Sequence, residues 1–159
     1  MRLRQVFDDL VRFETELWNA VDARLRSETG VPLGTFNLLL VVESTRACRV
    51  NDIAEKLAIT VGGASQAVDR IEQKGLCKRQ QDSADGRSSI ISITALGLRK
   101  LAEAAPVFDD ELGLWLNVPG TNTEIQHFAT VLARLRAAAS RRNRPHLVKS
   151  NSKKSKTKT

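Results

Sequence analysis

The chain is poor in the residues that build disulfide frameworks, metal sites and membrane spans. Its 159 residues include two cysteines, Cys48 and Cys77, and two histidines. These are too few for a disulfide framework or a zinc-like ligand cluster, so we expect neither a metal nor a cofactor. No apolar run reaches the roughly 18 to 20 residues of a membrane span, and the N-terminus lacks a signal-peptide core. We therefore expect a cytoplasmic protein that does not engage a membrane.

Catalytic motifs are also missing. The sequence shows no nucleophile with a nearby histidine and acid, no glycine-rich phosphate loop after a strand, and no metal cluster. His127 lies in a helical apolar stripe, where a structural or solvent-facing role is expected. With 42% apolar residues, the chain is able to form one domain with a substantial core. We do not expect an enzyme.

Charge is distributed unevenly along the chain. Residues 46–100 hold ten Lys and Arg against six Asp and Glu, whereas residues 1–45 and 101–140 are each slightly acidic. Residues 141–159 hold eight Lys and Arg, no acid and few apolar residues. We expect this basic tail to be disordered. It either raises DNA affinity without regard to base sequence or serves only as a solubilising extension.

Residues 51–79 predict two short amphipathic helices joined by a tight turn. Asn51 is expected to cap the first helix and Thr60 the second, while Gly75 ends the second helix in the left-handed conformation. Apolar residues at helical spacing form the inner face of each helix. This is how a protein places a helix in the DNA major groove. A plain helical hairpin in an all-α core is the alternative.

The outer face of the second helix is small, polar and basic, so it is able to approach base edges and phosphates. Gly62 and Gly63 either permit close approach to the sugar-phosphate backbone or simply fray the helix start. Gln66 contacts a base or is an ordinary solvated glutamine. The residues predicted to bind DNA, including the following hairpin and two arginines before the helix pair, are Arg46, Arg49, Thr60, Gly62, Gly63, Ser65, Gln66, Arg70, Lys74, Lys78, Arg79, Asp85 and Arg87.

A charged β-hairpin, or wing, is predicted to follow the helix pair. Leu76 to Arg79 is expected to be a strand, Asp82 to Gly86 has Asp-Gly turn chemistry, and Ile91 and Ile93 alternate with polar residues in a returning strand. A guanidinium on a narrow hairpin tip is able to enter a minor groove that is too tight for a helix. We assign this role to Arg87.

These segments together resemble the MarR family of transcriptional regulators. The resemblance rests on VDRIEQKGLCKR from Val68 to Arg79, then Asp85-Gly86-Arg87, then Thr94-Ala95-Leu96-Gly97, in matching order and spacing. It extends over roughly residues 3 to 140, and its specific motifs lie within about 51 to 97. The resemblance implies a fold that is mainly α with a small β-wing: a winged helix-turn-helix domain plus N- and C-terminal dimerisation helices.

The resemblance also implies a function. Family members are homodimers that bind a pseudo-palindromic operator, usually as repressors released by a small ligand or an oxidant. Ser65 and Gln66 match residues that read bases, Arg87 matches the wing arginine, and Asp85 matches an acid that braces it. Gly86 departs from the usual Asp-Arg-Arg signature and removes one phosphate-binding charge. The Gly62-Gly63 pair thins out side chains on the reading helix.

Two terminal helices carry more apolar surface than their own core needs. The first runs from Leu3 to near Gly30, and the second follows a capping box from Thr121 to Glu124. Burying this surplus in a dimer at about 25 cal/mol per Å² offsets the entropy of association, although packing within one chain is the simpler alternative. The residues expected at the dimer interface are Leu3, Val6, Phe7, Leu10, Ile125, Phe128, Leu132 and Leu135.

Between the terminal helices, a linking helix is expected over residues 94–118, bent at Pro106. The whole domain then covers residues 1–140, with dimerisation helices at 1–30 and 121–140, the winged helix-turn-helix at 46–97 and the tail at 141–159. Four aromatic residues either line an effector pocket near the linking helix or are plain core: Trp18, Phe36, Phe108 and Trp115.

Two other functions stay open. A winged-helix module that holds a protein partner predicts no operator-sized DNA footprint. A thiol-based redox regulator is the other alternative, but neither cysteine lies near the first helix, where some members of the resembled family sense peroxide. Cys77 opens the wing strand and is expected to be a small buried apolar residue.

Overall fold

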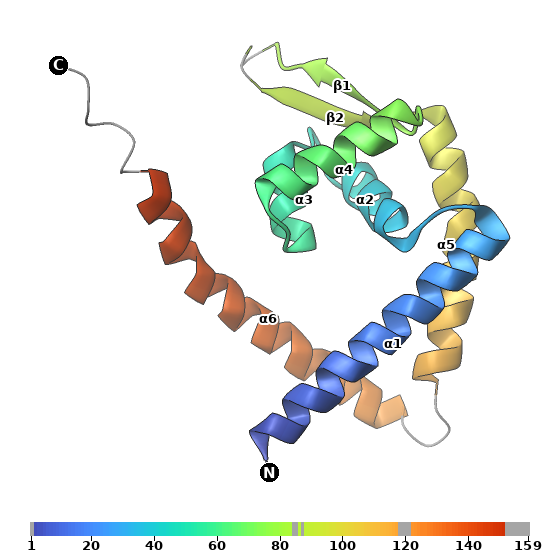
Figure 1. Ribbon diagram of the computed structural model, residues 1–159, viewed down its shortest axis with the longest axis vertical. Helices are drawn as coiled ribbons and strands as arrows, with labels where there is room; N and C mark the ends of the chain where they lie inside the picture. Colours follow the sequence, from blue (N-terminus) through green and yellow to red (C-terminus); the bar gives the residue numbers. More distant parts are fainter. Residues whose placement is uncertain (1, 84–85, 87, 118–121, 152–159) are drawn as a thin grey trace. The chain divides into compact units, whose positions relative to one another are not determined.

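A computed structural model describes residues 2–83, 86, 88–117 and 122–151, with side chains described as far as residue 141. The chain forms two compact units, residues 1–115 and 116–159. The first unit holds seven elements in the described residues (Figure 1), which are α1 (Leu3–Thr29), α2 (Leu33–Ser44), α3 (Val50–Leu57), α4 (Val61–Gln73), β1 (Cys77–Gln81), β2 (Ser89–Ile93) and α5 (Ala95–Leu116).

α1 confirms the long helix predicted at the N-terminus. It ends at Thr29, and Gly30 follows with φ 69°, a left-handed backbone that glycine adopts without strain. Only Val21 and Leu25 are buried along its length. The C-terminal half of α1 therefore belongs to the core, whereas its N-terminal half leaves large apolar side chains in solvent.

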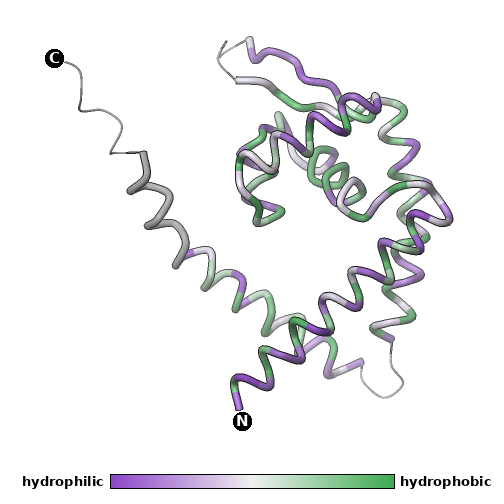
Figure 2. Tube along the Cα trace, in the orientation of Figure 1, coloured by the Kyte–Doolittle hydropathy of each residue, from purple (hydrophilic) through white to green (hydrophobic). Residues whose placement is uncertain are grey.

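α2 is the central helix of the first unit and was not predicted from the sequence. Six of its residues are buried, and Figure 2 shows it as a mainly hydrophobic segment. A helix that is apolar around most of its circumference has no amphipathic period. The periodicity that indicated the other helices was therefore absent here.

α3 and α4 form the predicted helix-turn-helix. The predicted cap at Asn51 is wrong, because α3 begins at Val50 and is preceded by Arg49. Asp52 completes this start by accepting a hydrogen bond of 2.8 Å from the backbone N–H of Arg49. Ala58 ends α3 with φ 53°, and α4 follows after a two-residue turn.

β1 and β2 form the predicted wing as a two-stranded antiparallel sheet in which Cys77 pairs with Ile93. The first strand begins one residue later and ends two residues later than expected. The wing also meets the loop before α3, where the Ile91 N–H donates to the Cys48 carbonyl at 2.7 Å. Asp85 and Arg87 lie outside the described residues.

The start of α5 is tied to the start of the wing. Thr94 caps the helix, because its hydroxyl accepts from the Gly97 N–H at 3.0 Å and donates to the Gly75 carbonyl at 2.6 Å. A Cβ at Gly97 would lie 2.1 Å from the Leu76 carbonyl oxygen. Only glycine therefore lets the helix approach the backbone this closely. Pro106 lies inside α5, as expected.

The second unit contains α6 (Asn122–Asn151). Thr121 of the predicted capping box lies outside the described residues. The helix continues through eleven residues that were expected to be disordered, because elongating an existing helix adds one hydrogen bond per residue without a new nucleation cost. None of the described helices in either unit has the length and hydropathy to cross a membrane.

Candidate nucleic-acid interface

α4 presents an inner apolar face and an outer polar face, as its sequence predicted. Ala64, Val68 and Ile71 are buried against the core, whereas Gln66 and Arg70 are exposed. Because the inner positions recur every three or four residues, the core fixes the rotation of the helix about its axis. The outer residues are thereby held toward solvent as a single surface.

The first turn of α4 is rigid and open at the same time. Thr60 caps it as predicted, with its hydroxyl oxygen accepting from the Gly63 N–H at 3.0 Å. A Cβ added at Gly63 would lie 3.1 Å from that oxygen, whereas one added at Gly62 would meet nothing within 4 Å. No packing within the chain therefore requires glycine at position 62. A molecule outside the chain is able to approach the helix backbone there.

Arg79 braces the wing against α4. Its guanidinium lies 2.7 Å from Asp69 and 2.6 Å from Glu72, and its backbone N–H donates to Glu72 at 2.9 Å. Burial lowers the pKa of Arg79, but hydrogen bonds to the two carboxylates outweigh burial and raise this pKa above its ordinary value. The arginine thus neutralises two acids on the reading helix that would repel DNA phosphate.

Arg49 holds the other side of the wing. Its guanidinium contacts the carboxylate of Asp82 and donates to the Ser88 hydroxyl at 2.5 Å. Asp82 is buried, although the sequence placed it in an exposed polar turn. A buried carboxylate requires a charged partner, and Arg49 supplies it. Arg49 and Arg79, both predicted to bind DNA, are therefore already engaged within the chain.

The cations that stay exposed lie around the outer face of α4. The described members are Arg46, Arg70, Lys74 and Lys78. Arg46 follows α2, Arg70 and Lys74 lie at the end of α4, and Lys78 lies on β1. This arrangement places positive charge on both sides of the helix, where the phosphates that border a groove would lie.

Both cysteines are buried, as expected for Cys77. Burial raises the pKa of Cys48, and burial together with the nearby charge of Glu72 raises the pKa of Cys77 to about 11. A thiol reacts with oxidants as its thiolate. The structure therefore disfavours a redox sensor at either position.

The four aromatic residues considered for an effector pocket lie in three different places. Phe36 is fully buried and stacks on Phe108 with ring centroids 4.7 Å apart. Trp115 contacts the Phe13 ring edge-on at 6.2 Å and donates to Glu111 at 2.9 Å. Trp18 is 43% exposed and lines a shallow hollow on α1. Phe36 and Phe108 are thus core residues.

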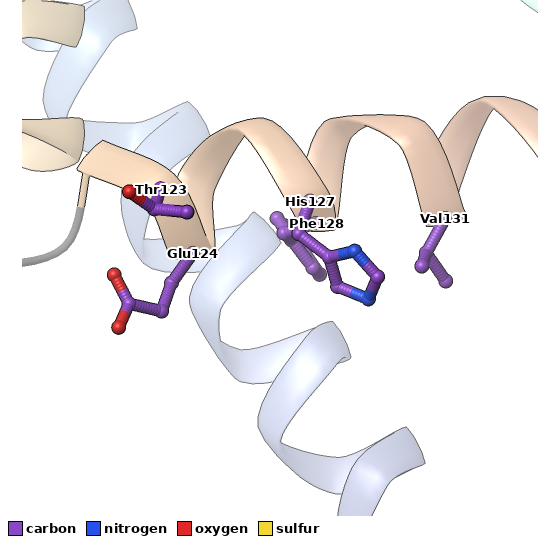
Figure 3. Close-up of a pocket in the computed structure, with 5 residues that line it drawn as sticks. All are labelled: Thr123, Glu124, His127, Phe128 and Val131. Carbon is purple, nitrogen blue, oxygen red and sulfur yellow. The ribbon is translucent and has the colours of Figure 1, made fainter.

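Each unit exposes apolar side chains predicted to lie at a dimer interface. On α1, these are Leu3, Val6, Phe7 and Leu10. On α6, Phe128 and Leu135 are exposed, while Ile125 and Leu132 are half-buried. Figure 3 shows Phe128 beside His127 in a hollow of about 390 Å³ along α6. No cluster of metal-ligating side chains occurs among the residues that the structure describes.

Helix α4, the wing that follows it and the helices around them define a winged helix-turn-helix protein. Residues 32–89 match the model of the MarR family, and the chain belongs to that family. One relative is an uncharacterized HTH-type transcriptional regulator of Bacillus cereus, which is 29% identical over 97 residues. The match covers 61% of this chain and 63% of that relative, so the chain spans less than two thirds of the relative's length.

Solved structures share the fold. Sco3205, a MarR family transcriptional regulator from Streptomyces coelicolor in complex with DNA, has a TM-score of 0.76 and 22% identity, over 83% of this chain and 84% of that one. CouR from Rhodococcus jostii RHA1, bound to p-coumaroyl-CoA, has a TM-score of 0.70 and 22% identity, over 80% of this chain and 88% of that one.

The sequence missed two features of the interface. Nothing in the sequence distinguishes an arginine that pairs within the chain from one that binds phosphate, so the partners of Arg49 and Arg79 emerged only in the structure. The turn between α3 and α4 also exposes two apolar side chains, Ile59 and Val61, which were not assigned to the site. Their placement next to a polar reading helix was the available signal.

Proposed function

We propose that this chain is a cytoplasmic, sequence-specific regulator of transcription that binds double-stranded DNA as a homodimer. The observation that carries the proposal is the exposed face of α4, held by the core on one side and by the wing on the other. Ser65 and Gln66 lie on this face, and a glutamine amide is able to make paired hydrogen bonds to adenine. The exposed cations around α4 supply sequence-independent affinity for phosphate.

The proposal includes an inverted-repeat operator. Two copies related by a two-fold axis present two reading helices, which fit half-sites roughly 34 to 36 Å apart. A ligand that favours another spacing weakens binding by shifting the population of conformations. Because CouR is bound to p-coumaroyl-CoA in its structure, we extend the proposal to a repressor that a small molecule releases.

Selection of bound sequences from random duplex DNA tests this function. The parent chain is expected to recover an inverted repeat, and Gln66→Ala to relax the preference at one position in each half-site. Gln73→Ala is the matched control, because Gln73 is an exposed glutamine at the other end of α4. This control should leave the selected motif unchanged.

Two further variants separate affinity from base reading. Arg87→Ala is expected to weaken binding to all sequences, and truncation after Ser140 to flatten the salt dependence while keeping the motif. A parent chain that enriches no sequence and gives no operator-sized footprint contradicts the proposal. That result would favour a winged-helix module for a protein partner.

A further inference from the structure

Helix α4 begins with an apolar step. Val61, its first residue, is 52% exposed, and Ile59 in the preceding turn is 42% exposed. Both side chains lie in the turn between α3 and α4 (Figure 1), next to a helix face that is otherwise polar. An isolated exposed apolar residue is ordinary on a protein surface. A pair of them at the start of a reading helix calls for a specific contact.

Helical spacing places Val61 beside the predicted base-reading residues. Ser65 lies one turn further along α4, on the same face as Val61, and Gln66 stands in the same relation to Gly62. A helical side chain leans toward the N-terminus and covers the turn before its own Cα. Because Gly62 has no side chain and no neighbour within 4 Å of a Cβ there, nothing in the chain separates this first turn from DNA.

The position of Val61 is fixed before any DNA binds. Thr60 caps the helix through the Gly63 N–H, and its carbonyl accepts from the Ala64 N–H at 2.9 Å. Valine is β-branched and has one strongly preferred rotamer in a helix. A contact made by this side chain therefore costs little conformational entropy.

One base offers an apolar partner in the major groove. Thymine carries a C5-methyl group there, whereas the other three bases present hydrogen-bonding atoms. We propose that Val61 is a specificity-determining residue that contacts a thymine methyl group in each half-site, with Gly62 allowing the first turn of α4 to come close enough. This inference rests on the proposed function, because it requires α4 to lie in the major groove.

Replacing thymine with uracil tests the contact, because uracil differs only in lacking the methyl group. The selected operator is prepared with single thymines changed to uracil in one half-site, and the Kd is measured for the parent chain and for Val61→Ala. At one thymine we expect uracil to weaken parent binding by about fourfold, the factor that corresponds to burying one methyl group. Val61→Ala should bind the thymine operator more weakly by a similar factor and be insensitive to uracil at that position.

Ile59→Ala is the matched control, because it shortens the other exposed apolar residue of the same turn and should keep full sensitivity to uracil. The inference is overturned if sensitivity to uracil is the same in the parent chain and in Val61→Ala at every thymine, or if Ile59→Ala alone removes it. In both cases the inverted repeat would still be selected and the proposed function would stand. Failure to select any operator overturns both.

Discussion

At the scale of single residues, the two glycines of α4 are predicted to differ. Gly62→Ala should raise the free energy of unfolding by about 0.8 to 1 kcal/mol, because alanine favours an exposed helix and the added Cβ meets no neighbour. Gly63→Ala should give a smaller gain or a loss, since its Cβ would lie 3.1 Å from the capping oxygen of Thr60. Urea denaturation of both variants measures the difference.

The same pair separates stability from DNA approach. If Gly62 is present so that the helix can come close to DNA, Gly62→Ala is more stable and yet binds the selected operator less tightly. Equal affinity of Gly62→Ala and the parent chain would show that position 62 does not touch DNA.

The buried thiol of Cys77 predicts a pH dependence of stability. Its pKa is raised from 9.0 to about 11 in the folded chain, so the unfolded chain loses this proton first. Between about pH 9 and pH 11 the free energy of unfolding should therefore fall. Urea denaturation across this range, in the parent chain and in Cys77→Ala, isolates the effect of the thiol. The parent should lose more stability than the variant with each rise in pH, and parallel profiles would contradict the prediction.

At the scale of elements, the wing and α4 are predicted to depend on Arg79 for their mutual position. Arg79→Gln removes two charged contacts from a side chain that is 25% exposed and leaves Asp69 and Glu72 unpaired. We expect the free energy of unfolding to fall by about 1 to 3 kcal/mol. Operator affinity should also fall, while the slope of log affinity against log salt stays that of the parent, because Arg79 is not a phosphate contact.

Lys78 is the control for this prediction, since it is the exposed neighbour of Arg79 on β1. Lys78→Ala should keep the stability of the parent and reduce the salt slope by about 0.9, the value for one phosphate contact. Unchanged stability of Arg79→Gln together with a smaller salt slope would instead assign Arg79 to phosphate.

Elements differed in how far the sequence could predict them. α1, α4 and the wing each have one buried face, so periodicity and turn residues indicated them within a few residues of their ends. α2 has no polar face and gave no period, although it is the centre of the core. Charged residues were harder still, because the pairing of Arg49 with Asp82 joins two segments that only the fold brings together. Local patterns contain no information about such a pair.

At the scale of the whole molecule, both units leave apolar surface in solvent. Phe7 is 69% exposed on α1, and Leu135 is 59% exposed on α6. Large exposed apolar residues on two helices are costly for an isolated chain, and burying them against a second copy recovers about 25 cal/mol per Å². The homodimer that we propose is the simplest assembly that covers them.

Phe7→Asp tests this assembly. Because Phe7 makes little contact with the core of its own unit, the variant should fold with unchanged helix content. A carboxylate at that position cannot be buried without a partner, so dimerisation should be lost or strongly weakened. Sedimentation is expected to give the mass of one chain, and binding to the full inverted repeat should fall to that of a single half-site. Asn19→Asp adds the same charge at an exposed position of α1 outside the predicted interface, and it should remain dimeric. If Phe7→Asp sediments as a dimer, the partner surface lies elsewhere on the chain.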